Sequence, residues 1–195
     1  MNVILRTLKK ILRSPWAYVY VAIIPIVNWS FAHVPTIPMP DGGQWAPFAV
    51  VTGLVLVFRD FVQRDIGNLV FIPLIIGVII SYKMAGPEIA IYSGLAFAIS
   101  EFVDWCVYNF TKRKFSTRVL ISSAVSAPVD TAVFLMGANM VVPGIFSYST
   151  MLTSIASKMF GAYIVYRIVR YNEKKEAVIN ASLGQTPVKK FRPRV

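Results

Sequence analysis

The sequence predicts an all-α polytopic membrane protein with six transmembrane helices and cytoplasmic N- and C-termini. Its 195 residues are 56% hydrophobic and 15% charged, and the mean hydropathy is +0.60. This composition is too apolar for an ordinary soluble domain. A helix that crosses a bilayer needs about 20 apolar residues, and the chain has room for about six such runs with short connections. One membrane domain is therefore expected.

The chain divides into three segments. Residues 1–14 form a basic amphipathic segment that leads into the membrane. No small-residue cleavage pattern follows the first apolar run, so we expect this segment to be retained. Residues 15–171 form the six-helix transmembrane domain. Residues 172–195 carry six basic and two acidic residues with little hydrophobic periodicity, which predicts a flexible basic cytoplasmic tail.

Breaks in the apolar pattern separate the predicted spans. Residues 33–44 and 141–149 contain proline and glycine but no lysine or arginine, a composition typical of external loops. Gly86-Pro87 ends the third span, and residues 111–118 form the densest basic loop. The six spans that these breaks delimit are residues 16–32, 45–61, 69–85, 88–110, 119–140 and 148–171.

The basic residues indicate which side of the membrane each loop occupies. Of the 20 lysines and arginines, 4 precede the first span, 2 lie in the turn between the second and third, 4 lie between the fourth and fifth, and 8 surround the C-terminus. Because cytoplasmic loops carry the excess of basic residues, both termini are predicted to be cytoplasmic. This topology explains the formal charge of +11 without a nucleic-acid partner.

The residue types that build metal centres and common enzyme sites are scarce in this sequence. Cys106 and His33 are the only cysteine and histidine, so we expect neither an internal disulfide nor a metal centre. The sequence also lacks a Walker loop and the H-E-x-x-H, G-x-S-x-G and G-x-G-x-x-G patterns. We therefore expect a protein that is not an enzyme and has no cofactor.

Ionisable residues inside the predicted spans are the candidate functional residues. A charge at mid-bilayer costs roughly 2.5–3.5 kcal/mol on insertion scales, so such residues usually face a cavity or a partner. Glu101 and Asp104 share one face of the fourth span, with Tyr108 one turn further along it. Asp130 lies midway along the fifth span, and Lys158 lies within the sixth.

Lys158 is the obvious countercharge for these acids, but one cation leaves part of the group unbalanced. We therefore expect that some carboxyl group is protonated, which permits proton coupling without showing it. Asp130 follows Pro128, whose missing N–H frees a backbone acceptor beside the acid and favours a ligand site. The alternative is that Lys158 and one aspartate form a structural pair between helices.

Other polar residues have two interpretations. Asn28 in the first span either binds a ligand or joins helices through hydrogen bonds. Asp60 and Arg64, with the neighbouring Arg59 and Asp65, lie where the second span meets the cytoplasmic boundary. They either anchor the helix at the interface or belong to a functional motif.

Several motifs together resemble the vitamin uptake transporter family, whose characterised bacterial members transport queuosine precursors. The resemblance covers most of the chain, and it rests on six matches in the same order. These are Asn28 in the first span, Trp45 with the apolar run after it, Asp60-Arg64-Gly67, Val103-Asp104 with Val107-Tyr108-Asn109, Ser126 to Phe134 with Asp130-Thr131, and Lys158 before an apolar final helix.

The resemblance implies a bacterial inner-membrane protein that imports a 7-deazapurine, such as 7-cyano-7-deazaguanine, for tRNA modification. A carboxylate can accept the N–H groups of a guanine-like edge, Lys158 or Asn109 can donate to its carbonyl, and an aromatic ring can stack on its plane. The substrate-binding residues that it implies are Asp104, Asp130 and Lys158 as the central set, with Glu101, Asn28, Asn109 and Tyr108 beside them.

Glu101 and Trp105 depart from this pattern, which keeps queuine or another vitamin-like molecule open as the cargo.

Two other functions also stay open. Asp104 and Asp130 could serve an intramembrane aspartyl protease, although the Gly-x-Gly-Asp pattern of those enzymes is missing. The chain could also be a binding subunit that needs an ATP-hydrolysing partner. The expected partners are the bilayer, a small-molecule substrate and, for a dimeric transporter, a second copy of the chain.

Overall fold

The computed structural model describes residues 8–85, 87–111, 114–141 and 143–182. Within these ranges the chain folds into six long helices, with a short helical segment at residues 8–12 before them. The long helices are α2 Pro15–His33, α3 Ala49–Ile66, α4 Phe71–Ala85, α5 Pro87–Phe110, α6 Phe115–Val141 and α7 Tyr148–Ser182. Two-residue strands β1 Ile37–Pro38 and β2 Gln44–Trp45 form an antiparallel hairpin, and the 3-10 helix η1 Gly67–Val70 joins α3 to α4.

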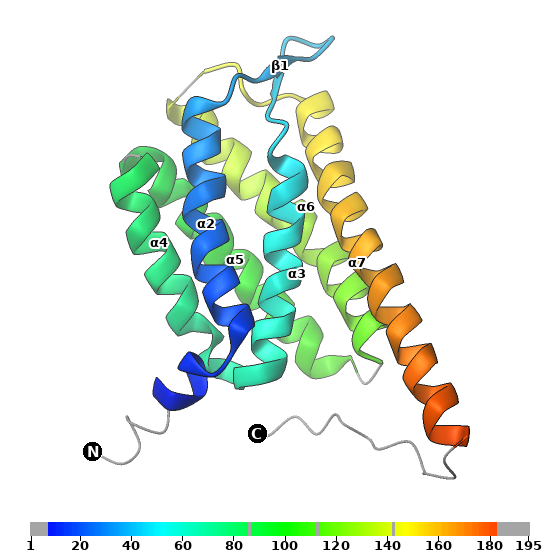
Figure 1. Cartoon of the computed structure of the whole chain (residues 1–195). Helices are drawn as coiled ribbons and strands as arrows, with labels where there is room; N and C mark the ends of the chain where they lie inside the picture. The colour runs from blue at the N-terminus through cyan, green and yellow to red at the C-terminus, as the bar shows by residue number, and fades with distance from the viewer. Residues whose placement is uncertain (1–7, 86, 112–113, 142, 183–195) are drawn as a thin grey trace.

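The helices run up and down in a single bundle (Figure 1). The β1–β2 hairpin lies at one end of the bundle, which we name the hairpin end. The start of α2 and the end of α7 lie at the opposite end, which we name the terminal end. The two turns that the sequence analysis assigned to the cytoplasm, between α3 and α4 and between α5 and α6, also lie at the terminal end.

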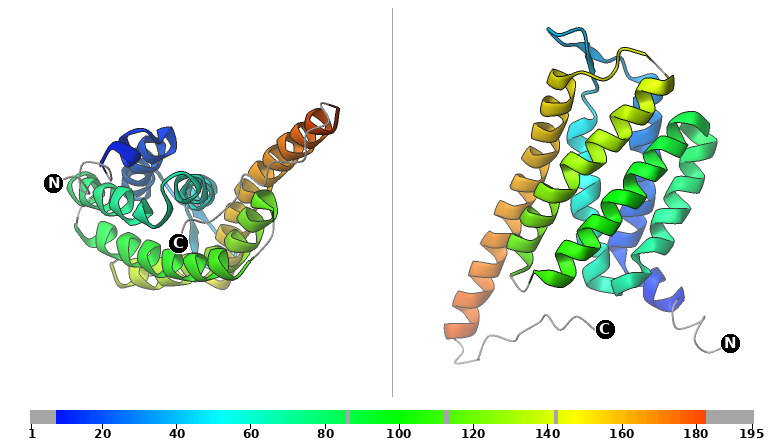
Figure 2. Two further views of the ribbon diagram at one scale, coloured as in Figure 1. Left: turned by 90° about the horizontal axis from the view of Figure 1, so that it is seen from below. Right: turned by 180° about the vertical axis from the view of Figure 1, so that it is seen from behind.

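Helix α3 holds the bundle together. It packs against α2 and α7 and also contacts α6, whereas α5 packs mainly on α6 and α4 mainly on α2. Seen from the terminal end, α3 lies between α2 and α7 and faces the layer that α5 and α6 form (Figure 2). Two thirds of its residues, including Arg59, Asp60 and Gln63, are buried. Arg59 and Asp60, which the sequence singled out, therefore point into the bundle, whereas Arg64 is exposed.

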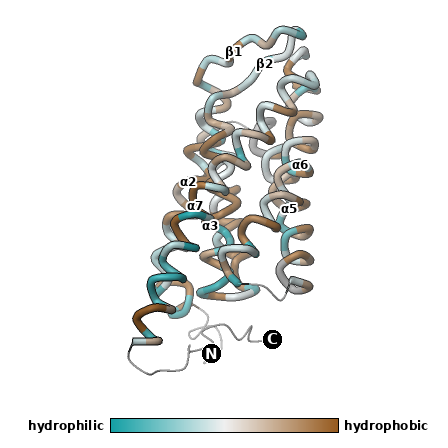
Figure 3. The backbone as a smooth tube through the Cα atoms, turned by 90° about the vertical axis from the view of Figure 1, so that its right-hand side faces the viewer, coloured by the Kyte–Doolittle hydropathy of each residue, from teal (hydrophilic) through white to brown (hydrophobic). Residues whose placement is uncertain are grey.

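The distribution of polar residues is that of a membrane protein. Arg59 is 1% exposed and Glu101 is 2% exposed, whereas Ile75 on α4 is 57% exposed and Leu152 on α7 is 68% exposed. A soluble protein seldom buries charges while it exposes large aliphatic side chains, but a lipid environment favours this arrangement. The hydropathy of the backbone shows hydrophobic residues along most of the helices and a hydrophilic terminal end of α7 (Figure 3).

Three described stretches are long and apolar enough to cross a membrane by length and composition alone, namely Pro15–His33, Ala49–Met84 and Phe115–Val141. The second of these contains α3 and α4. Helices α5 and α7 do not qualify by this measure, and they carry Glu101, Asp104 and Lys158. The prediction of an all-α membrane protein is confirmed, whereas six separate spans and the cytoplasmic termini stay predictions.

Helix α7 is longer than the sixth predicted span. It continues past Tyr171 to Ser182, so residues 172–182 of the segment expected to be flexible are helical. The sequence of this extension contains glutamate, lysine and alanine and neither glycine nor proline, which lets the helix continue beyond the apolar run. The rest of the predicted tail, residues 183–195, and residues 1–7 of the predicted N-terminal segment lie outside the described part of the chain.

Glycines set the distance between α3 and α7. A Cβ atom on Gly53 would lie 2.5 Å from the backbone Cα of Lys158, and one on Gly161 would lie 3.3 Å from the carbonyl oxygen of Val50. Small residues at a helix interface permit this close backbone approach in membranes. The contact at Gly53 places the Lys158 backbone directly against α3.

Replacing Gly53 by alanine should lower the melting temperature of the detergent-solubilised protein, because the new methyl group can fit only if α7 moves. We expect a cost of about 2 kcal/mol, typical of overpacking. Gly94→Ala is the matched control, since its Cβ would meet only a Val78 methyl group, at 3.1 Å. Equal melting temperatures for the two variants would contradict the tight α3–α7 contact.

Candidate functional site

Buried charged side chains form two groups inside the bundle. The first, which we name the Arg59 cluster, consists of Tyr20, Arg59, Asp60, Glu101, Asp104 and Ser122. The second, which we name the Lys158 cluster, consists of Ser100, Asp130, Thr131 and Lys158. Both clusters draw residues from several helices, so each charge lies next to a partner from elsewhere in the chain.

The guanidinium group of Arg59 is the centre of the first cluster. Its Nε donates to Glu101 Oε2 at 2.7 Å, and one of its terminal nitrogens donates to the Glu101 backbone oxygen at 3.1 Å. The other terminal nitrogen donates to Asp60 Oδ1 at 3.1 Å and forms an ion pair with Asp104. One arginine therefore bridges α3 and α5 through three carboxylates. Arginine suits this role because the five N–H donors of its guanidinium group lie in a rigid planar fork.

Hydroxyl groups from two more helices complete this cluster. The Tyr20 hydroxyl on α2 donates to Glu101 Oε1 at 3.0 Å, and the Ser122 hydroxyl on α6 donates to Asp60 Oδ2 at 3.0 Å. The Arg59 cluster thus connects four helices. Asp104 Oδ1 is buried and has no hydrogen-bond partner among the described residues, so it is an acceptor that remains open.

This arrangement corrects the charge count made from the sequence. Lys158 was expected to be the only countercharge for Glu101, Asp104 and Asp130, but Arg59 pairs with two of these acids. Arg59 and Asp60 are also buried inside the bundle, so they do not lie on its outer surface. Sequence reasoning left Arg59 out of the site residues. The signal that could have found it is the excess of buried acids, which requires a second buried cation.

The Lys158 cluster lies on α5, α6 and α7. Lys158 Nζ donates to Asp130 Oδ2 at 2.6 Å and to the Thr131 hydroxyl at 2.8 Å. The Ser100 hydroxyl lies 3.5 Å from the other oxygen of Asp130. The expected pairing of Lys158 with an aspartate is therefore present, and the partner is Asp130.

One face of α6 runs from the first cluster to the second. Ser122, Ser126 and Asp130 are spaced four residues apart and are all buried, so they lie along one stripe of the helix. Ser122 bonds to Asp60 and Asp130 bonds to Lys158. The Ser126 hydroxyl between them has no hydrogen-bond partner in the described structure. This stripe is a line of polar groups through the bundle.

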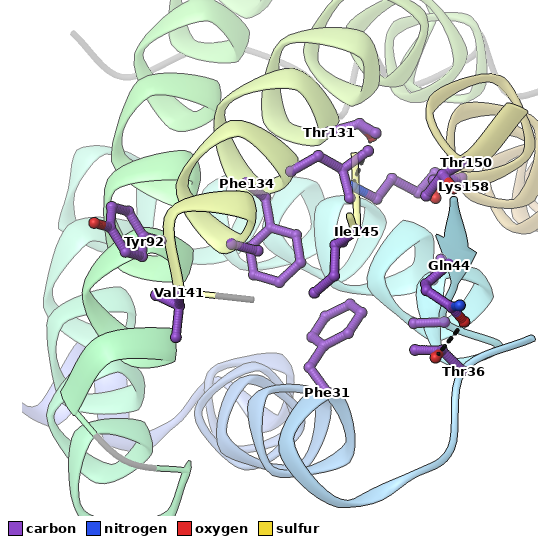
Figure 4. Close-up of a pocket in the computed structure, with 15 residues that line it drawn as sticks. Phe31, Thr36, Gln44, Tyr92, Thr131, Phe134, Val141, Ile145, Thr150 and Lys158 are labelled. Atoms are coloured by element: carbon purple, nitrogen blue, oxygen red, sulfur yellow. Dashed lines mark hydrogen bonds between the residues drawn. The ribbon is translucent and has the colours of Figure 1, made fainter. Parts of the chain in front are cut away.

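A cavity leads from the hairpin end of the bundle to the Lys158 cluster (Figure 4). Thr36 and Gln44 line its mouth and are hydrogen-bonded to each other at 2.9 Å, and Lys158 and Thr131 line its inner part. The rings of Phe31 and Phe134 also line it and contact each other, with their centroids 4.7 Å apart. Most of the remaining wall is aliphatic or aromatic, from residues such as Tyr92, Leu135, Val141 and Ile145. This is a largely apolar pocket with a few polar groups, which is typical of small-molecule sites.

The other predicted site residues are placed as follows. Asn28 is buried and bonds to Ser81 on α4 and Ser93 on α5, contacts that join helices. Arg64 lies over the rings of Phe61 and Phe115 at the terminal end of α3, apart from the buried contacts of Asp60. Tyr108 and Asn109 belong to α5, but their side chains lie outside the described part of the structure.

The two aspartates required for an aspartyl protease have separate partners. Asp104 is paired with Arg59 and Asp130 with Lys158, so each carboxylate is held by a different cation. An aspartyl protease needs two carboxylates that share one proton and one water. The geometry does not favour that alternative.

The bundle buries charged side chains, exposes aliphatic ones and contains a cavity that reaches a buried ion pair. These features are those of a multi-pass membrane protein of the small-molecule transporter class. Comparison with protein families shows which one: the family described as Putative vitamin uptake transporter matches residues 48–171, and the chain belongs to that family. No curated protein and no solved structure gives a significant match. The matched range contains every charged residue of both clusters, whereas Tyr20 and Phe31 on α2 lie before it.

The β1–β2 hairpin is attached to the start of α7 by Asp41. Its carboxylate accepts the backbone N–H of Ser149 at 2.9 Å and that of Gly43 at 3.4 Å. The Ser149 bond is the main reason that the pKa of Asp41 is lowered from 3.8 to about 2. Thr36 lies just before this hairpin and Gln44 lies in β2, and both line the cavity. The Asp41–Ser149 bond therefore helps to hold the cavity mouth in place.

The attachment of the hairpin should depend on pH in the acidic range. The pKa of Asp41 is lower in the folded chain than in the free amino acid, so the bond contributes fully above about pH 4 and is lost as the pH falls through about 2. The protection of the Ser149 amide, which is its exchange rate relative to the intrinsic rate at the same pH, should therefore fall on acidification in the native protein. In Asp41→Asn the exchange should lack this titration. An identical pH profile for the two proteins would contradict the assignment.

Removing the positive charge of the Arg59 cluster should destabilise the protein strongly. Arg59→Gln leaves buried carboxylates without their cation, which costs about 3 kcal/mol or more. We expect a large fall in the melting temperature in detergent. The double variant Arg59→Gln with Glu101→Gln removes one charge of each sign and should recover part of the loss. A double variant no more stable than the single one would contradict the pairing.

Proposed function

We propose that this chain is a secondary transporter that imports a queuosine precursor, 7-cyano-7-deazaguanine or a related 7-deazapurine, across the bacterial inner membrane. The observation that carries the proposal is the cavity that Lys158 and Thr131 line at its inner part, next to the rings of Phe31 and Phe134, with Asp130 bonded to Lys158. Membership of a vitamin uptake transporter family supports the function class. The cargo itself rests on the chemistry of the cavity and on the family resemblance.

The lining of the cavity suits a planar, uncharged and polar-edged molecule. Among its described residues Lys158 is the one charged side chain, and Asp130 balances it. The ammonium group of Lys158 and the hydroxyl group of Thr131 can donate to a ring carbonyl, and the side-chain oxygens of Gln44 and Ser154 can accept from ring N–H groups. The aromatic rings can stack on the plane of the base.

The Phe31–Phe134 pair acts as a gate in this proposal. The two rings are in contact, with their centroids 4.7 Å apart, so a base can stack between them only after they separate. An aromatic pair contributes about 0.5–1.5 kcal/mol beyond its burial, a barrier that stacking on the cargo can offset. Opening of the gate would therefore accompany binding.

The Arg59 cluster closes the path toward the terminal end, which we place in the cytoplasm. Cargo that leaves Lys158 meets the stripe of Ser126 and Ser122 and then the carboxylates around Arg59. The open acceptor at Asp104 and the unpartnered hydroxyl group of Ser126 are groups that a passing base can use. Asp130 is also the candidate for proton coupling, because a proton on its carboxylate would release Lys158 for the cargo.

The test is the queuosine content of tRNA in a bacterium that lacks both precursor synthesis and its own importer. Expression of the native chain with low external 7-cyano-7-deazaguanine should restore queuosine. Lys158→Gln should abolish this restoration, because it removes the main donor at the end of the cavity. Lys83→Gln, which changes an exposed lysine at the hairpin end of α4, is the matched control and should restore queuosine fully.

A neutral double variant separates loss of function from loss of folding. Lys158→Gln with Asp130→Asn removes both charges of the pair and leaves neither buried charge alone. It should accumulate in the membrane and still fail to restore queuosine. Full restoration by either Lys158 variant would contradict the proposed site. If the native chain is present in the membrane but does not restore queuosine, the proposed cargo is wrong and the transporter class is unaffected.

A further inference from the structure

A groove of about 820 Å³ lies at the terminal end of the bundle, between α7 and the start of α6. Its walls combine apolar, aromatic and basic side chains, among them Leu120 of α6 and Arg167, Ile168, Arg170, Tyr171 and Lys174 of α7. We propose that this groove binds the headgroup of an anionic phospholipid. The site is separate from the transport cavity and does not depend on the identity of the cargo.

The positive charges of the groove point to one side of α7. Arg167, Arg170 and Lys174 are three and four residues apart, so they share one face of the helix. Among the described residues no carboxylate forms an ion pair with any of them. Glu173 accepts hydrogen bonds from the backbone N–H and the hydroxyl group of Ser116, at 3.1 and 2.6 Å. Its carboxylate is thus engaged with α6.

Tyrosines hold the two arginines in position and leave most of their donors free. Arg167 donates to the Tyr163 hydroxyl at 2.9 Å, and Arg170 donates to the Tyr166 hydroxyl. Each guanidinium group has five N–H donors, so these contacts leave several for a phosphate. An arginine pre-positioned in this way loses less side-chain freedom when it binds an anion.

The position of the groove along α7 matches the depth of lipid headgroups. With a rise of about 1.5 Å per residue, Arg167 lies roughly 30 Å along the helix from Tyr148, which is about the thickness of the hydrocarbon core. Tyr171 is largely exposed at this level, as is typical of aromatic residues at a membrane interface. Leu120 and Ile168 offer an apolar wall for the acyl chains below the headgroup.

The proposal can be tested with the purified full-length protein by native mass spectrometry from mixed phosphatidylglycerol and phosphatidylcholine micelles. The native protein should retain phosphatidylglycerol in preference to phosphatidylcholine. A basic residue near an anionic surface contributes about a fivefold gain in affinity, so Arg167→Gln with Arg170→Gln should lower retention by about 25-fold. Glutamine keeps a long polar side chain and removes only the charge.

Lys9→Gln with Arg13→Gln is the matched control, because these residues lie in a different surface cleft and the double change also removes two positive charges. It should leave retention within about twofold of native, because neither residue lines the groove and the electrostatic contribution falls off within a Debye length. Equal retention of both lipids, or equal losses in the two double variants, would overturn the proposal. Loss of a dimer in Arg167→Gln with Arg170→Gln, with lipid retention unchanged, would also overturn it and would assign the groove to a second copy of the chain.

Discussion

The buried guanidinium group of Arg59 is the interaction on which the rest of the structure depends. It lies on the most central helix and contacts carboxylates from α3 and α5, while Tyr20 of α2 and Ser122 of α6 bind the same carboxylates. A buried charge is costly unless its partners are well placed. The position of four helices is therefore constrained by one side chain, and a shift of any of them would leave a charge uncompensated.

The two clusters differ in whether a cavity reaches them. The Lys158 cluster faces the cavity from the hairpin end, whereas the Arg59 cluster has no cavity among those found in the described structure that reaches it. Between them, on α6, the buried Ser126 hydroxyl has no hydrogen-bond partner among the described residues. In the proposed transporter, the polar groups between the clusters would serve as the route for the cargo, and the Arg59 cluster would close it on one side.

The apolar runs predicted the helices well, because a helix that meets lipid must be apolar on its outer side. The same patterns could not predict that Arg59 is buried, since a charged residue at this point of the sequence is typical of a membrane boundary until its partners on α5 are known. Those partners are about 40 residues away in the sequence, and local periodicity contains no information about such pairs. Lys158 and Asp130 were predicted together because each was an isolated charge in an otherwise apolar helix. Phe31 was not predicted, because an aromatic residue in a span has no distinctive signal.

The glycine contact between α3 and α7 has a consequence for how the bundle can rearrange. Gly53 brings the α3 backbone against the backbone of Lys158, and Gly161 repeats the close approach near Val50. Backbones in such contact cannot slide past each other without a clash, so α3 and α7 form a single rigid unit. In the proposed transporter, the motion that exposes cargo to the other side would then occur between this unit and the remaining helices. The lysine that contacts the cavity would serve as its fixed pivot.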